Sequence, residues 1–384
     1  MGKTLAMRRK FLCSLLFVCS FSLVNGEPGD LIVFGTYTKG GKSKGIYQAR
    51  FLESEGLLHD EPDLGAELEN PSFLTFHSTN LWLYAVSEVA SHNGGGLITS
   101  FAVGSESGEL EQTGQQPTGG AGPCHISMTP DGKILGVANY QSGTVSTFLV
   151  KEDGSLTPPV STIQHEGSSV NPKRQKSPHA HSINFSPDGK FAYAADLGTD
   201  SIFVYSVDPE TGKLTPSSET KLPPGSGPRH FTFRPEGAFA YVINEMLLNV
   251  TAFSVDKESG GLSSIQTLST LPPGVENIGS TAEVVCHKSG KFLYGSNRGH
   301  DSIVVYSIDD ESGTLTYVEN EPIQGEVPRN FVLSPDGKWL LAAGQKSNSV
   351  TVFSIDQKTG ELEFNGARYH VPSPVCIRIF DENN

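Results

Sequence analysis

The stretch "PRHFTFRPEGAFAYVINEMLLNVTAFSVDKESGGLSS", residues 228–264, decides how the rest of the chain is interpreted. Two apolar segments flank a turn at Gly237, and a third apolar segment follows a polar loop. A turn at Gly260 then leads into a short fourth segment. Alternating side chains rich in β-branched and aromatic residues are typical of strands. The stretch therefore predicts a four-stranded antiparallel unit.

The same pattern recurs along the chain. Related units occupy residues 123–158, 178–216, 282–317 and 328–364, with a looser copy at 70–112. The proline that opens the unit recurs at positions 71, 123, 178, 228, 328 and 374. Its average spacing is about 50 residues, and four strands in about 50 residues describe one blade of a β-propeller.

The two ends of the chain together supply one more blade. "LIVFGTYTKGGKSKGIYQARF" (31–51) provides its second and third strands, and "SPVCIRIF" (373–380) provides its first strand. A blade shared by both ends closes the ring and leaves no open sheet edge there. We therefore predict an all-β, seven-bladed β-propeller with four-stranded antiparallel blades, a single domain spanning residues 27–384.

Residues 1–26 have the features of a secretory signal peptide. Three basic residues, 8–10, precede an apolar run from Phe11 to Val24, and small residues lead up to Gly26. An uncleaved membrane anchor and lipid attachment at Cys19 are the alternatives. We expect export to the periplasm or the medium, with no membrane association after cleavage.

Charge and cysteine content exclude several classes of protein. Removal of residues 1–26 takes away four basic residues and no acidic ones, which shifts the formal net charge from −14 to −18. Such a surface repels nucleic acid and anionic membranes. Cys124, Cys286 and Cys376 show neither a CxxC pattern nor a zinc-ligand spacing, so we predict small buried side chains, no metal and no cofactor.

Ionisable residues mark the ends of the predicted inner hairpins. Arg229 and Glu245 stand eight residues before and after Gly237. At about 3.3 Å per residue, both ends of such a hairpin lie more than about 20 Å from its turn, at one mouth of the channel. The same count around each turn gives the predicted rim residues His181, Arg229, His230, Glu245, Glu283 and Arg298. It also reaches His125, Tyr140, Arg329, Asn330 and Gln345.

This variety of side chains at the rim suggests chemistry, because a purely structural repeat does not need it. Two arginines can bind a carboxylate or phosphate, or stabilise an oxyanion. His181, Glu245 and Glu283 are candidate acids or bases. The alternative is that strand ends simply face water. The polar stretch 164–180 is either a mobile loop over the mouth or an ordinary solvated loop.

A second polar patch is "SNRGHDSI", residues 296–303. We include Asn297 and His300 as candidate substrate-binding residues, together with His230 and Glu283. The alternative for His300 and Asp301 is a turn in which the aspartate accepts backbone N–H groups.

The segments "SPHAHSINFSPDGKFAYAADLG", "GPRHFTFRPEGAFAYVINE" and "AEVVCHKSGKFLYGSNRGHDSI" closely resemble the seven-bladed propeller lactonases. These are the bacterial 6-phosphogluconolactonase family, related to the fungal carboxy-muconate lactonising enzymes. The resemblance covers nearly the whole chain beyond residue 26. It implies a monomeric, metal-free propeller that acts on an anionic lactone, with His181, Arg229, Glu245 and Arg298 as its catalytic residues.

The resemblance leaves the reaction open between three functions. The first is hydrolysis of an acidic sugar lactone, with Glu245 or His181 activating water. The second is cyclisation of a muconate-type diacid into a lactone. The third is a non-catalytic propeller that binds a sugar or a protein. An export signal also conflicts with the cytoplasmic reaction of 6-phosphogluconolactone, so another exported lactone is an alternative substrate.

Overall fold

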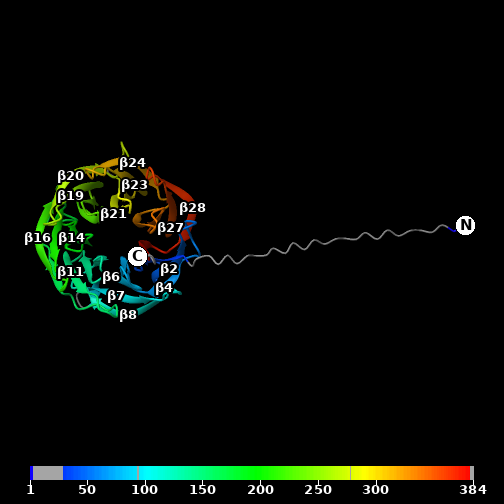
Figure 1. Cartoon of the computed structure of the whole chain (residues 1–384), viewed down its shortest axis with the longest axis horizontal. Helices are drawn as coiled ribbons and strands as arrows, with labels where there is room; N and C mark the ends of the chain where they lie inside the picture. Colours follow the sequence, from blue (N-terminus) through cyan, green and yellow to red (C-terminus); the bar gives the residue numbers. More distant parts are fainter. Residues whose placement is uncertain (3–28, 93–94, 277, 381–384) are drawn as a thin grey trace.

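Seven β-sheets surround a central axis in the computed structural model, which describes residues 1–2, 29–92, 95–276 and 278–380 (Figure 1). The chain passes round the ring once, so that the red β28 lies beside the blue β2. The described residues contain no helix long and apolar enough to cross a membrane. The predicted all-β propeller of seven antiparallel blades is confirmed.

Six blades are built from consecutive strands, each blade running from the axis outward. Blade 1 contains β5 (Leu74–Phe76), β6 (Trp82–His92), β7 (Gly95–Val103) and β8 (Leu110–Pro117). Blade 2 contains β9 (Pro123–Met128), β10 (Ile134–Asn139), β11 (Thr144–Leu149) and β12 (Ser161–Gln164). Blade 3 contains β13 (Ala180–Phe185), β14 (Phe191–Asp196), β15 (Ser201–Val207) and β16 (Leu214–Lys221). Blade 4 contains β17 (Pro228–Phe233), β18 (Phe239–Asn244), β19 (Asn249–Val255) and β20 (Leu262–Ser269). Blade 5 contains β21 (Ser280–Cys286), β22 (Phe292–Arg298), β23 (Ser302–Ile308) and β24 (Leu315–Pro322). Blade 6 contains β25 (Pro328–Leu333), β26 (Trp339–Gly344), β27 (Ser349–Ile355) and β28 (Leu362–His370).

Blade 7 joins the two ends of the chain as predicted. Its inner strand is β29 (Pro374–Ile379), which pairs with β1 (Asp30–Thr36), and β1 pairs with β2 (Gly45–Leu52). The outer edge is divided into β3 (Leu57–Leu58) and β4 (Asp63–Glu67), both paired with β2. Pro62 lies between these two segments and has no N–H group for the ladder, which explains the interruption.

A repeated contact joins blades 1, 3, 4 and 5 each to the next blade. In blades 3, 4 and 5 the second strand begins with Phe-x-Tyr, and in blade 1 it begins with Trp-Leu-Tyr. Tyr241, for example, donates a hydrogen bond to the carbonyl oxygen of Gly313 in blade 5. A Cβ on Gly313 would lie 2.3 Å from the Phe239 ring, and its φ is +68°. Only glycine fits this turn, because the left-handed backbone and the ring each exclude a side chain.

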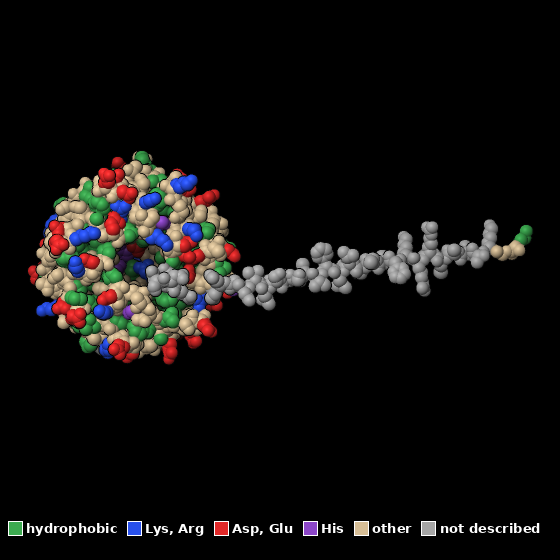
Figure 2. Space-filling model, viewed as in Figure 1, with side chains coloured by type: hydrophobic (Ala, Val, Ile, Leu, Met, Phe, Trp, Pro, Cys, Tyr) green, Lys and Arg blue, Asp and Glu red, His purple; other side chains and the backbone are tan. Residues whose placement is uncertain are grey.

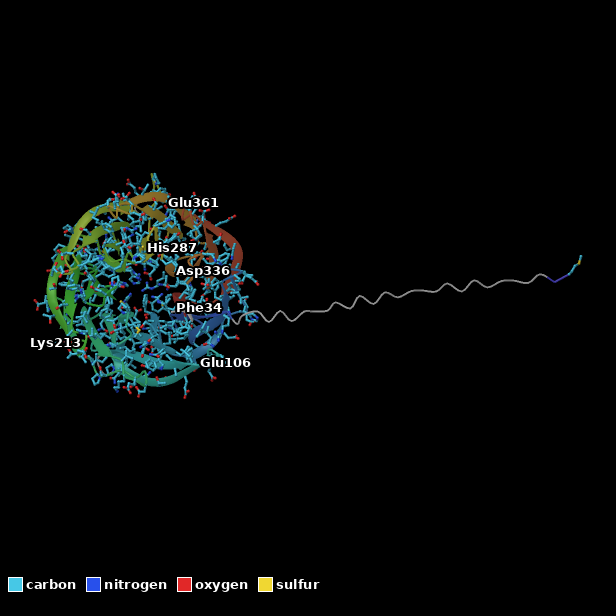
Figure 3. All side chains as sticks on the ribbon, in the orientation of Figure 1. Phe34, Glu106, Lys213, His287, Asp336 and Glu361 are labelled. Atoms are coloured by element: carbon cyan, nitrogen blue, oxygen red, sulfur yellow. The ribbon has the colours of Figure 1, made fainter. Side chains whose placement is uncertain are left out.

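The strands nearest the axis form the wall of the channel. β5, β9, β13, β17, β21, β25 and β29 each contact the next, and β29 contacts β5 to close the ring. In Figure 3, Glu106, Lys213 and Glu361, from turns between third and fourth strands, lie toward the outer edge of the disc. His287 and Asp336, from inner hairpin turns, lie closer to the axis.

One sequence prediction concerns residues outside the described ranges, and another concerns cysteines that lie within them. The predicted signal peptide, residues 1–26, lies almost entirely outside them, so it stays a prediction. Cys124, Cys286 and Cys376 are free thiols, of which Cys124 and Cys376 are buried and Cys286 is partly buried.

Candidate active site

A β-bulge near the start of each of six inner strands directs side chains toward the channel. In β17 the pairing with β18 shifts between Pro228 and His230, which leaves Arg229 as the extra residue. His181 of β13 and Arg329 of β25 occupy the same position in their strands. A bulge leaves one residue out of the ladder and turns its side chain away from the sheet. The neighbouring blades therefore present a histidine and two arginines at one level of the channel.

Glu245 is the centre of the first cluster of charges. Its backbone N–H donates to the carbonyl oxygen of Gly227, which holds the end of β18 beside the start of β17. Oε2 lies 3.1 Å from Nε of Arg229 and 3.0 Å from Nη2 of Arg298. Oε1 accepts a hydrogen bond of 2.7 Å from Nη2 of Arg174. Three guanidinium groups thus share one buried carboxylate.

The arginines hold Glu245 in its ionised form. Burial works to raise the pKa of Glu245, but Arg298, Arg229, His181 and Arg174 hold that pKa well below its ordinary value. Burial lowers the pKa of Arg298 to about 9, and the like charge of Arg229 acts in the same direction. Arg298 still carries its charge at neutral pH. Its Nε atom is buried and has no hydrogen-bond partner within residues 29–92, 95–276 and 278–380.

A fourth arginine approaches the same region from blade 6. Nη2 of Arg329 donates to the hydroxyl of Tyr37 at 2.9 Å, and that hydroxyl donates to Glu88 at 2.8 Å. The guanidinium also lies over the Tyr37 ring, 5.2 Å from its centroid. Four arginines therefore face two carboxylates, Glu245 and Glu88, and the local charge is positive in a chain whose net charge is −14. Such a field attracts an anionic ligand.

A second cluster contains His230 and Asn330, which follow the bulged arginines in their inner strands, together with Glu283. Nδ1 of His230 lies 2.7 Å from Oε1 of Glu283. The other oxygen of Glu283 accepts a hydrogen bond from Nδ2 of Asn330. His230, Glu283 and Asn330 come from blades 4, 5 and 6 and are all buried. The second cluster is therefore a histidine–carboxylate–amide network inside the ring.

Three imidazoles lie together at this point. The ring centroid of His230 lies 5.4 Å from that of His181 and 5.2 Å from that of His125. Burial lowers the pKa of each of these histidines well below its ordinary value, so all three rings are neutral at neutral pH. The Sγ atom of Cys124 lies 3.7 Å from Nδ1 of His181. Burial raises the pKa of this thiol, so it remains protonated and is a poor nucleophile.

The structure brings six of the eight predicted site residues together: His181, Arg229, His230, Glu245, Glu283 and Arg298. Asn297 and His300 have other partners. Nδ2 of Asn297 donates to the carbonyl oxygen of Thr270, and Nδ1 of His300 lies 2.7 Å from Oγ of Ser302. Within the described ranges neither side chain forms a hydrogen bond or ion pair with the six. The geometry therefore gives these two residues roles in the turn after β22 and no link to the clusters.

Sequence reasoning did not select Arg174, which comes from the polar stretch 164–180. This stretch carries no repeat signal, yet it is anchored to the ring. Nε2 of the buried Gln175 donates to Asp200 and to the carbonyl oxygen of Leu197. Nη2 of Arg174 contacts Glu245 and the Tyr140 hydroxyl. The prediction left open whether this loop covers the mouth, and its contacts show that part of it does.

The three arginine side chains that contact Glu245 differ in their exposed fraction. The side chain of Arg174 is 43% exposed, that of Arg298 is 14% exposed, and that of Arg229 is 2% exposed. A ligand that enters from this side therefore meets Arg174 first. Figure 2 shows a hollow at the centre of the ring with acidic, basic and histidine side chains inside it. In the described part of the chain, no group of three or more His, Cys, Asp or Glu side chains is placed to hold a metal ion.

Comparisons with known proteins give consistent results. The family model described as "Lactonase, 7-bladed beta-propeller" matches residues 31–379. A 6-phosphogluconolactonase of Bacillus subtilis is 35% identical over 348 residues, which cover 91% of this chain and 97% of the relative. A protein of the same name from Formosa agariphila is 34% identical and covers 78% of this chain and 85% of its own length. The solved structure of a periplasmic gluconolactonase from Pseudomonas aeruginosa has a TM-score of 0.85 and 35% identity, and the match covers 92% of this chain and 99% of that structure.

Proposed function

Because the chain belongs to the seven-bladed β-propeller lactonase family, we propose that it hydrolyses an anionic sugar lactone at the mouth of its central channel. The observation that carries this proposal is the arginine cluster around Glu245. The cluster combines a buried positive field with a donor, Nε of Arg298, that has no hydrogen-bond partner among the described residues. A buried unpaired donor is costly, and a ligand oxygen would satisfy it.

Arg229 and Arg298 are proposed to bind the substrate. Each also donates to a backbone carbonyl oxygen: Arg229 to Ala282 at 2.7 Å and Arg298 to Thr281 at 2.6 Å. These bonds fix the guanidinium planes before a ligand arrives. Donors that are already oriented stabilise the oxyanion that develops when water attacks a lactone carbonyl carbon. A phosphate or carboxylate on the substrate can use the outer arginines, Arg174 and Arg329.

The hydrogen bonds of Glu245 help to decide whether Glu245 or His181 transfers the proton. Both carboxylate oxygens of Glu245 accept from guanidinium groups. A carboxylate held in this way is a weak base. We therefore propose that Glu245 positions the arginines and that an imidazole transfers the proton.

Two names among the relatives suggest two substrate classes. The Bacillus subtilis relative is named for a phosphorylated sugar lactone and the Pseudomonas aeruginosa structure for an unphosphorylated one. Initial rates of the purified protein on 6-phosphogluconolactone and on glucono-δ-lactone, each corrected for spontaneous hydrolysis, test the proposal. We expect turnover of at least one of the two. Absence of turnover on both lactones contradicts hydrolysis, and formation of a lactone from a muconate-type diacid would replace it with the cyclisation reaction.

We also propose that the protein is exported and works as a monomer. The basic start, apolar run and small residues within residues 1–26 support export. The name of the Pseudomonas aeruginosa relative places that protein in the periplasm. Every residue of the two clusters comes from one chain, which is compatible with a monomeric enzyme. Cell fractionation and a mass measurement of the purified protein test both points.

A further inference from the structure

His230 has one satisfied ring nitrogen and one free ring nitrogen. It is the residue after the bulged Arg229 in β17, and its side chain is 4% exposed. Nδ1 lies 2.7 Å from Oε1 of Glu283. Nε2 is buried and has no hydrogen-bond partner in the described part of the chain. A buried polar atom without a partner needs an explanation, and a ligand or water that takes part in function is one.

A chain of hydrogen bonds determines which nitrogen carries the proton. The backbone N–H of Ile377 donates to Oδ1 of Asn330 at 2.8 Å, so Nδ2 of Asn330 must point the other way, toward Glu283. The backbone N–H of Val284 donates to Oε1 of Glu283 at 3.0 Å. Both carboxylate oxygens therefore accept from obligatory donors. Burial raises the pKa of Glu283, but the charges of Arg378 and Arg229 and the Val284 N–H oppose this shift. An ionised Glu283 satisfies both of these donors and places the imidazole proton on Nδ1 of His230.

The free Nε2 atom of His230 consequently carries a lone pair. This is the arrangement of a general base whose tautomer is fixed by a buried carboxylate. The neighbouring His125 has the opposite arrangement. Its Nδ1 accepts from the backbone N–H of Ile183 at 3.4 Å, which leaves the proton on Nε2. His181 has no carboxylate bonded to its ring, and its Nδ1 lies against the thiol of Cys124.

We propose that His230 is the general base of the lactonase reaction and that Glu283 and Asn330 are its positioning residues. This inference rests on the proposed function. Nε2 of His230 removes a proton from water while the water oxygen bonds to the lactone carbonyl carbon. The carbonyl π electrons move to the oxygen, which the arginines stabilise. The ring C–O bond then breaks, and the leaving oxygen takes the proton from Nε2. The resulting hydroxy acid releases its own proton to solvent.

The surroundings of His230 set the expected pH dependence. The charged and titratable groups that face it are Glu283, His125, His181, Arg229, Arg298, Arg329 and Arg378. Burial, followed by the charge of Arg229, lowers the pKa of His230 well below the ordinary value. The neutral ring is the active form of a base. Activity should therefore persist at pH values below 6.5 and fall only as His230 becomes protonated.

The test compares three variants of the purified protein. Asparagine carries its amide nitrogen where histidine carries Nδ1, so His230→Asn keeps a donor for Glu283 and removes Nε2. We expect kcat to fall by about 10²- to 10⁴-fold, the range for loss of a general base. His287→Asn is the matched control, since it removes a buried imidazole in the inner hairpin turn of blade 5, outside both clusters, and its kcat should stay within about threefold of the wild type.

Glu283→Gln tests the positioning role. Loss of the carboxylate removes the group that stabilises protonated His230, so the acidic limb of kcat against pH should move to lower pH while kcat falls at least about tenfold. A purely structural role would leave that limb in place. Histidine ¹⁵N shifts of the wild type report the tautomer independently of activity. We expect a protonated Nδ1 and an unprotonated Nε2 at His230.

Several outcomes would overturn the inference. A His230→Asn protein with kcat within threefold of an active wild type would do so while leaving the proposed lactonase function intact. An Nε2–H tautomer at His230, or an unmoved acidic limb in Glu283→Gln, would have the same consequence. A wild type that hydrolyses neither lactone removes the proposed function itself, and the base assignment falls with it.

Discussion

Replacing Glu245 by glutamine should destabilise the propeller and change how its stability depends on pH. In the wild type the carboxylate is 6% exposed and lies within 3.1 Å of nitrogen atoms from three arginines. Glutamine keeps the shape but not the charge. Arg229 then remains as a buried guanidinium with the Ala282 carbonyl oxygen as its main partner, and Arg298 depends on the Thr281 carbonyl oxygen.

The size of the effect depends on which arginine is buried. Arg174 is 43% exposed, so solvent screens its ion pair and the loss there is small. Arg229 and Arg298 lie inside, where removal of one partner of a buried ion pair costs about 3–5 kcal/mol. Roughly 350 residues at about 2.1 cal/mol/K each give an unfolding entropy of about 0.7 kcal/mol/K. We therefore expect the midpoint of thermal unfolding to fall by about 4–7 °C.

The pH dependence follows from the lowered pKa of Glu245. A carboxyl group whose pKa is lower in the folded state stabilises that state above its unfolded pKa, which is about 4.3 for glutamate. This contribution disappears as pH falls toward the folded pKa. The gap between wild type and Glu245→Gln should therefore be constant from about pH 5 to 8 and should narrow in more acidic buffers.

Differential scanning calorimetry at one scan rate, repeated from pH 3 to 8, measures both effects. Glu67→Gln serves as the control, because Glu67 forms a surface ion pair with Lys44 in which both side chains are more than half exposed. Its midpoint should change by no more than about 1 °C. A Glu245→Gln protein that behaves like this control at every pH would refute the claim that a buried carboxylate balances the arginines.

Four further substitutions test separate parts of the structure. Arg298→Lys keeps a positive charge but loses the planar fork, so we expect kcat/KM to fall about 10²-fold while the circular dichroism spectrum stays unchanged. Arg174→Gln should raise KM for 6-phosphogluconolactone several-fold more than KM for glucono-δ-lactone, with kcat nearly constant; equal changes for both substrates would contradict an anion-binding role. Val327→Gly relieves a φ of +60° at a β-branched residue and should stabilise the fold by about 0.5–1 kcal/mol in urea unfolding, whereas Gly227→Val at the equivalent position should destabilise it.

The sequence was sufficient to predict the ring because its signals are local and repeated. The strand pattern recurs in every complete blade, the opening proline in all of them except blade 5, and the glycine of the hairpin turn in all of them except blade 1. The shared blade followed from the leftover strands at the two ends, since a propeller closes by pairing them. The divided outer edge of blade 7 was not predicted, because only a single proline, Pro62, interrupts it.

The site was predictable only in part. Counting from the turns placed Arg229 near Glu245 without any knowledge of the bulge. In the register Glu245 lies opposite Gly227, and the side chains of Arg229 and Glu245 span the remaining offset with a contact of 3.1 Å. Arg174 could not be found by counting, since its loop lies outside the repeat. The tautomer of His230 was also beyond reach, because it depends on Asn330 and a backbone amide in a blade assembled from the far end of the chain.

The bulges explain how one repeated backbone supports two different tasks. In blade 4 the bulged residue, Arg229, contacts Glu245, whereas the following residue, His230, contacts Glu283. In blade 6 Arg329 contacts Tyr37, whereas Asn330 contacts Glu283. In these two blades the bulged position therefore supplies an arginine, and the next position supplies a residue of the second cluster.

This separation matters for the proposed chemistry. A base in direct contact with a guanidinium group would lose the lone pair that it needs, as Glu245 illustrates with both oxygens occupied. One residue further along the strand, His230 keeps a free nitrogen in the described part of the chain, while the charges of Arg229 and Arg298 act on the same ring. A propeller with the same bulges but apolar residues at both positions would keep the fold and have neither the anion site nor the base. The residues at and after the bulges, together with Glu245, Arg298 and Arg174, therefore decide which chemistry this channel can support, and the repeated backbone of the blades does not.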